Sequence, residues 1–105
     1  MAKLIALLRK APHLSREEMI RYYETKHVPL IRSIVPGILD YRRNYLEEPI
    51  EGCDILTEIT FADRASYDAA MAAAAKPDAA QRIANDEENF LDRSATRLLL
   101  AEERR

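Results

Sequence analysis

His27 is the residue of this chain whose chemistry best suits catalysis near neutral pH. Its imidazole exchanges a proton in the physiological range, so it can act as a general acid or base. It shares an apolar helical face with Tyr23 and Ile31. Pro29 predicts a kink or break beside it, because proline lacks an amide donor and disfavours helical angles at Val28. A broken helix opens space for a pocket. The alternative is a core histidine that bonds a backbone carbonyl.

Glu58 is the second catalytic candidate, because it interrupts an otherwise apolar strand. A carboxylate in that position must be paired, hydrogen-bonded or directed at a cavity, since burying it unpaired is costly. Two interpretations stay open. Glu58 can orient His27 or a substrate, or it can form a cross-strand ion pair with Arg42 or Arg43.

Four further side chains are predicted to bind a substrate. Tyr23 lies one helical turn before His27, where it lines the same pocket or packs as a core aromatic. Tyr41 and Asn44 offer polar groups from a neighbouring strand, and Phe90 belongs to the apolar face of the last helix. Glu87 shares that face and marks its solvent-exposed edge.

The residues give little support for metal binding, for a cysteine nucleophile or for nucleotide binding. The spacing between His13 and His27 is not that of a metal site, and Cys53 has no evident activating base. With only two glycines, the chain has no glycine-rich phosphate loop. The sequence therefore predicts no cofactor and no metal.

The elements that must position these residues follow the order βαββαβ. Apolar patterning predicts strands over residues 3–9, 39–46, 55–61 and 97–102, with a connecting loop over 47–54. Ser15 and Glu18 form a capping-box signature for the first helix, whose predicted inward face carries Ile20, Tyr23, His27, Leu30, Ile31 and Ile34. A second helix spans 67–75 and a third starts at Pro77. This order is the α+β, ferredoxin-like arrangement, in one domain over 1–105.

The first and last strands predict a homodimer. Both helices of a split-βαβ fold cover one sheet face, so the other face of a monomer should be polar. Residues 4–8 and 98–101 are instead apolar on both sides. A second copy is the economical cover for such a face. The alternative is that these strands occupy a well-covered centre of the sheet.

Length and charge exclude several classes of function. The chain has 105 residues, a net charge of −2 and one cysteine. That charge gives no electrostatic footprint for nucleic acid or an anionic membrane. The apolar run near the start is too short for a signal peptide or a membrane span, so we expect a cytoplasmic protein.

The combination of motifs resembles the EthD-like family of dimeric α+β barrel proteins over essentially the whole chain. The residues that carry the resemblance are Lys3-Leu4-Ile5-Ala6-Leu7-Leu8, Leu14-Ser15-Arg16-Glu17-Glu18, Tyr22-Tyr23-Glu24, His27-Val28-Pro29-Leu30, Pro36-Gly37, Tyr41-Arg42-Arg43-Asn44-Tyr45, Thr57-Glu58-Ile59-Thr60-Phe61-Ala62-Asp63 and Asp86-Glu87-Glu88-Asn89-Phe90-Leu91-Asp92. The resemblance implies sheets packed face to face in a dimer, with a small-molecule pocket in each subunit. It also implies that His27 and Glu58 are the family's histidine and strand carboxylate.

Three functions remain open at this point, because fold analogy does not settle function. The first is a cofactor-independent enzyme in which His27 moves a proton next to a carbonyl, giving isomerisation, cyclisation or decarboxylation of a small aromatic, polyketide or lactone-like molecule. The second is a non-catalytic accessory protein of an oxygenase system. The third is a cofactor-free oxidoreductase.

Overall fold

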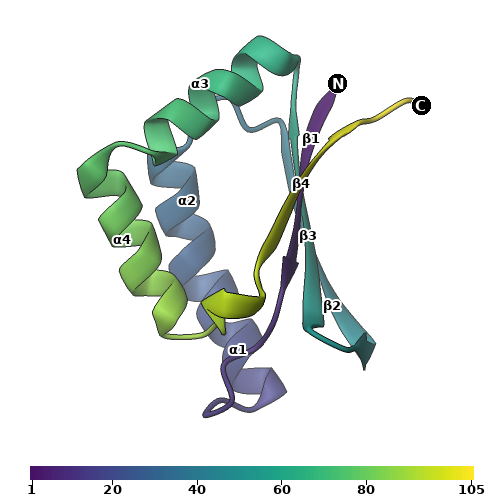
Figure 1. The fold of residues 1–105 in the computed structure, drawn as a ribbon, viewed down its shortest axis with the longest axis vertical. Helices are drawn as coiled ribbons and strands as arrows, with labels where there is room; N and C mark the ends of the chain where they lie inside the picture. Colours follow the sequence, from purple (N-terminus) through teal and green to yellow (C-terminus); the bar gives the residue numbers. More distant parts are fainter.

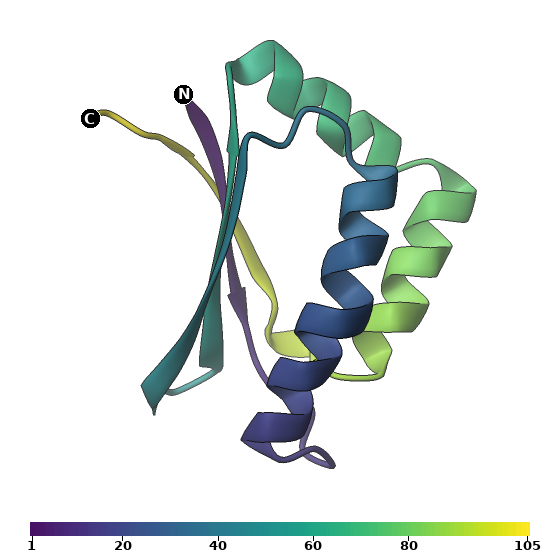
Figure 2. The same ribbon diagram turned by 180° about the vertical axis from the view of Figure 1, so that it is seen from behind.

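A four-stranded antiparallel sheet forms one layer of the structure, and the helices form the other. The computed structural model describes all 105 residues. The strands are β1 (Ala2–Leu8), β2 (Asp40–Ile50), β3 (Cys53–Phe61) and β4 (Arg97–Glu102), in the spatial order β2-β3-β1-β4. The helices are α1 (Arg16–Tyr22), α2 (Val28–Ile34), α3 (Arg64–Ala74) and α4 (Pro77–Glu88), with a short 3₁₀ turn at Arg93–Ala95. All of them lie on the same side of the sheet (Figures 1 and 2). The predicted ferredoxin-like fold class is confirmed.

The helical segment around His27 does not break at Pro29, so the predicted break, with Val28 outside helical angles, is wrong. A π-helical turn over Tyr23–His27 joins α1 to α2, and Val28 keeps helical angles. The amide of Val28 donates to the carbonyl of Tyr23, five residues back. Pro29 then lies in the first turn of α2, where its missing amide costs least. Turns of this π type are frequent at functional sites.

The same π turn changes which residues face the sheet. Ile20, Leu30 and Ile34, which the pattern placed inside, are only partly buried. The buried positions are instead Met19, Tyr23, His27, Ile31 and Val35, at uniform steps of four, together with Val28 beside His27. A regular α-helix drifts away from a four-residue repeat because its period is 3.6. The longer π period keeps these five positions on one face.

The predicted loop over 47–54 is also wrong. Strand β2 continues to Ile50, which pairs with Cys53 at the start of β3. Glu51 and Gly52 form the turn, and Gly52 takes a φ of +76°, which glycine adopts without steric cost. Pro49 suggested a loop, but β2 is an edge strand, where a residue without an amide donor is tolerated.

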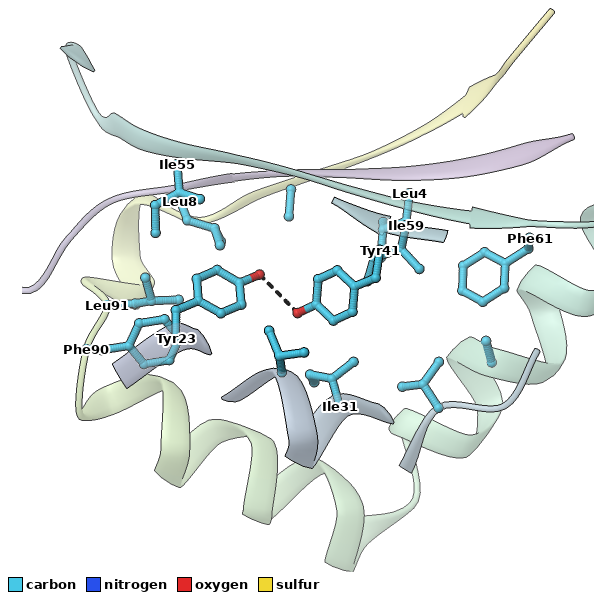
Figure 3. Close-up of a cluster of buried hydrophobic side chains, with 14 of the residues drawn as sticks. Leu4, Leu8, Tyr23, Ile31, Tyr41, Ile55, Ile59, Phe61, Phe90 and Leu91 are labelled. Carbon is cyan, nitrogen blue, oxygen red and sulfur yellow. Dashed lines mark hydrogen bonds between the residues drawn. The ribbon is translucent and has the colours of Figure 1, made fainter. Parts of the chain in front are cut away.

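The hydrophobic core lies between the sheet and the helices. In β1, Ala2, Leu4, Ala6 and Leu8 are buried beneath the helices, while the alternate residues are only partly buried. Figure 3 shows the strand side chains meeting Tyr23, Ile31, Phe90 and Leu91 from the helical layer. The core is thus built by strand alternation on one side and the four-residue helical repeat on the other.

The opposite face of the sheet carries no helix, and we call it the open face (Figures 1 and 2). The register of β4 against β1 assigns the leucines that the sequence left ambiguous. Leu98 and Leu100 pair with Ala6 and Leu4, so they lie on the helical side. Leu99 pairs with Ile5 and therefore lies on the open face, where it is 50% exposed. None of the helices combines the length and apolarity needed to cross a membrane.

Candidate functional site

The imidazole of His27 is held between two helical elements. His27 ends the π turn and is 4% exposed. Its Nδ1 lies 2.8 Å from Oδ2 of Asp86 on α4. The rings of Tyr23 and Phe90 flank it, with centroids at 5.4 and 4.9 Å. The ring therefore has little freedom to rotate away from the carboxylate.

Asp86 is itself held in place by further hydrogen bonds. The Tyr22 hydroxyl donates to its other oxygen, Oδ1, at 2.6 Å, and Asn89 Nδ2 donates to that hydroxyl at 2.8 Å. Burial, together with the bond to Asp86, raises the pKa of Tyr22, so the hydroxyl stays a donor. An ionised carboxylate accepts only, which places the proton of a neutral His27 on Nδ1. Nε2 is then the basic nitrogen.

Nε2 of His27 is free to meet a ligand. It makes no hydrogen bond, whereas every side-chain nitrogen or oxygen that is fully shielded from solvent in this protein has a hydrogen-bond partner. Accessible space must therefore reach it. Oε2 of Glu87 lies 4.0 Å away, too far for a hydrogen bond but close enough to stabilise positive charge on the ring. Arg93 holds the other oxygen of Glu87 at 3.2 Å.

Such space is offered by a cavity of about 160 Å³ between the sheet and the helices, which His27 lines. Thirteen of its sixteen lining residues are hydrophobic, and His27, Thr57 and Glu87 are the others. The lining comes from β1, β2, β3 and β4 and from the helical layer. Leu98, 61% exposed, lines it from the edge strand β4.

Three hydroxyl groups form a chain on the wall of this cavity. The Tyr23 hydroxyl lies 3.0 Å from that of Tyr41 and 2.8 Å from Oγ1 of Thr57. In Figure 3 the Tyr23 and Tyr41 rings point toward each other from the helix and from the sheet, with their oxygens joined. Burial raises the pKa of both tyrosines, so both hydroxyls stay protonated. Tyr23 and Tyr41, which the sequence predicted as substrate-binding residues, both line the cavity.

Glu58 and Asn44 are not part of this site. Both lie on the open face, where Glu58 accepts from Lys3 Nζ and from Asn44 Nδ2, each at 3.0 Å. The bond to Lys3 lowers the pKa of Glu58. The expectation that Glu58 orients His27 is corrected, because strand alternation directs residues 57 and 58 to opposite faces. Glu58 does form an ion pair, but with Lys3 of β1, while Arg42 bonds Asp40.

Phe90 is fully buried behind His27 and does not line the cavity. It packs on the rings of Tyr22, Tyr23 and His27, so it supports the site without facing a ligand. Asp86 is the residue that the sequence reasoning missed. Its signal was a carboxylate at i+3 from Ile83, beside the apolar face of α4, on a helix expected to pack near the first.

Comparison with known proteins agrees with this architecture. The model of the EthD domain family matches residues 11–94. The chain belongs to the EthD family. No curated protein matches it.

No three His, Cys, Asp or Glu side chains gather closely enough to hold a metal ion.

Solved structures share the EthD chain's fold over nearly its full length. An EthD family protein from Bacillus halodurans is 24% identical, with a TM-score of 0.70 and 99% of each chain covered. SnoaB, a cofactor-independent oxygenase from Streptomyces nogalater, is 11% identical with a TM-score of 0.64, covering 99% of this chain and 93% of SnoaB. A dimeric ferredoxin-like protein of unknown function from Bacteroides fragilis is 13% identical with a TM-score of 0.59, covering 97% and 95%.

Proposed function

We propose that this EthD family protein is a cofactor-independent enzyme that moves a proton on a small, apolar, oxygenated substrate. The observation that carries the proposal is the His27–Asp86 pair, whose free Nε2 opens on an apolar cavity. Isomerisation, cyclisation and decarboxylation all use such a step at the carbon next to a carbonyl.

The size of the cavity limits the substrate. An apolar cavity of about 150 Å³ in another protein accommodates benzene. The cavity here, at about 160 Å³, therefore suits a single ring or a lactone of similar size. A multi-ring polyketide would need the helices or the β4 edge to move. The cavity lining also has no cationic side chain, and Glu87 repels anions, so a neutral molecule fits better than a ring acid.

The residues supply a complete acid–base cycle. Nε2 of His27 takes a proton from the substrate carbon, and the positive charge that develops on the ring is shared with Asp86 through Nδ1–H. Glu87, 4.0 Å from Nε2, stabilises the same charge. The proton then returns from Nε2 to the same or another carbon. A positioned acid–base group of this kind contributes about 10²–10⁴ in rate.

Two alternatives keep a role for the same cavity. A cofactor-free oxygenase reaction also begins by removing a proton, and the similarity to SnoaB favours it as the second candidate. Oxygen consumption with a turned-over substrate separates it from isomerisation. An accessory protein would bind the same class of molecule without turnover.

Assembly as a homodimer is part of the proposal. Ile5, Leu7, Leu56 and Leu99 leave apolar surface on the open face, and no helix remains to cover it. Lys3, Glu58 and Asn44 bond one another within this face, so these groups can be buried with their charges paired, while Arg97 on the same face at the start of β4 is exposed. A second copy of the same face is the cover that closed two-fold symmetry provides.

Hydrogen–deuterium exchange at the α-carbons of cyclohexanone tests proton transfer without knowledge of the natural substrate. We expect the wild-type protein in D₂O to accelerate the exchange seen by NMR, and His27→Gln to lose about 10²–10⁴ of that acceleration. Glutamine keeps much of the volume but cannot shuttle a proton. His13→Gln, in an exposed turn, is the control. Full exchange by a folded His27→Gln protein would remove His27 from the mechanism, and no exchange by the wild type would favour accessory binding.

A further inference from the structure

The three linked hydroxyl groups on the cavity wall carry one proton more than the hydrogen bonds between them require. Tyr23, Tyr41 and Thr57 carry three hydroxyl protons, and two hydrogen bonds join them. None of the three hydroxyls makes a hydrogen bond to any other protein group. One O–H therefore has no acceptor in the protein. All three residues line the cavity, so the remaining proton is available to a molecule inside it.

The chemistry of the hydroxyls gives the chain a direction. A phenol is the better donor and an aliphatic alcohol the better acceptor, so we assign Tyr23 as the donor in its contact with Thr57. Because the single hydroxyl proton of Tyr23 is then used in the bond to Thr57, Tyr41 must be the donor in the bond between the two tyrosines. The free proton is left on Oγ1 of Thr57, and the two bonds behind it polarise it cooperatively.

From these observations we propose that Thr57, backed by Tyr23 and Tyr41, binds the oxygen of a neutral carbonyl substrate. This inference deepens the proposed function and rests on it for the reaction, though not for binding. The cavity offers one donor and no cation, so it fits a ketone, enone or lactone in place of a carboxylate.

The site would also stabilise the charge that His27 creates. When Nε2 removes the α-proton, the C–H electron pair becomes a C=C bond, and the carbonyl π pair moves to oxygen as an enolate. The Thr57 hydroxyl donates to that oxygen throughout and transfers no proton. Because the donor is already oriented by Tyr23, it needs no reorganisation as charge develops. Thr57 and His27 line the same cavity, and Tyr23 contacts both: its hydroxyl bonds Thr57, and its ring centroid lies 5.4 Å from that of His27.

A triple variant, Tyr23→Phe/Tyr41→Phe/Thr57→Val, removes every hydroxyl while keeping the shapes of the side chains. Removing all partners of a buried network together is close to neutral for stability, so we expect it to fold. The probes are cyclohexanone and methylenecyclohexane, which lacks the acceptor oxygen. Thr57→Val alone locates the terminal donor. Tyr45→Phe is the matched control, because the Tyr45 hydroxyl bonds Glu24 and lies outside the cavity lining.

We expect wild-type protein to lower the infrared C=O frequency of bound cyclohexanone below its value in a hydrocarbon. The triple variant should restore the hydrocarbon value and weaken cyclohexanone binding about threefold to tenfold, with methylenecyclohexane unaffected. Thr57→Val should reduce the shift, and Tyr45→Phe should not. An unshifted band in the wild type, or an unchanged shift in the triple variant, overturns the proposal. His27→Gln should keep the shift but lose exchange, so the carbonyl site and the acid–base function fail independently.

Discussion

His27 Nδ1 and Asp86 Oδ2 lie 2.8 Å apart although 59 residues separate them in the chain. The π turn presents the histidine from one helical segment, and α4 presents the carboxylate from another. The bond fixes both the tautomer of the imidazole and its angle, and so determines which nitrogen meets the cavity. Orientation of the base is thus a product of helix packing, and it can be removed without touching the histidine.

Asp86→Asn should lower activity while leaving the fold intact. The amide group of the substituted side chain can donate to Nδ1 of His27, which would place the histidine proton on Nε2 and leave no base toward the cavity. We expect a loss of roughly 10²–10⁴ in cyclohexanone exchange, by analogy with orienting carboxylates in catalytic triads. Glu88→Gln, an exposed carboxylate on the same helix, is the matched control and should exchange normally. Equal rates in both variants would show that Asp86 has no orienting role.

Leu99→Glu should dissociate the dimer. The glutamate would be desolvated against the partner's open face, which costs several kcal/mol and raises the dissociation constant roughly 100-fold or more. Sedimentation velocity over a range of concentrations measures it. Leu39→Glu, at a leucine that is 61% exposed and precedes β2, should leave the assembly unchanged. A wild-type protein that sediments as a folded monomer would contradict the proposed interface.

Met19→Ala should destabilise the protein more than Ile20→Ala. Met19 is 1% exposed in the core, whereas Ile20 is only partly buried. Truncating a buried methionine costs about 2–5 kcal/mol, and Arg21→Ala at the neighbouring exposed position should cost within about 0.5 kcal/mol. Urea unfolding measures all three. If Ile20→Ala lost more stability than Met19→Ala, the inward face of the helix would follow the 3.6-residue period, and the four-residue repeat would be contradicted.

Glu24 should stabilise the protein in a pH-dependent way. Arg43 donates to both its oxygens, at 2.9 and 2.6 Å, and lowers the pKa of Glu24 below its ordinary value of 4.5. The stabilisation is present above 4.5 and is lost as the pH falls through the lower, folded-state pKa.

Glu24→Gln should therefore be less stable than the wild type near neutral pH, by about 1 kcal/mol or less because the pair is partly exposed. The difference should shrink as the pH falls well below the ordinary glutamate pKa of 4.5. Thermal unfolding of both proteins near neutral pH and well below pH 4.5 measures this difference in stability, with Glu47→Gln at an exposed position of β2 as the control. A difference that persists in acid would point to packing and not to charge.

The sequence predicted local features well where a residue's own chemistry decides them. The capping box at Ser15 and Glu18 forms as expected, because both bonds lie within four consecutive residues. The alternation of Ile55, Thr57 and Ile59 against Leu56 and Glu58 is a property of any strand. The same alternation placed Glu58 on the opposite face from Ile55 and Ile59. The sequence did not say which of these two faces packs against His27 and the helices, and the structure shows that it is the face of Ile55 and Ile59.

The sequence by itself determined the element order, the ferredoxin-like fold and His27 as the candidate base, since strand and helix periods are set by neighbours along the chain. Tertiary structure alone decided that Asp86, and not Glu58, meets His27, because that contact depends on how two helices distant in sequence lie side by side. It also decided the surplus hydroxyl proton, which exists only where Tyr23 from a helix reaches Tyr41 and Thr57 from two strands. Periodicity places a side chain on a face, but only packing determines what it touches there.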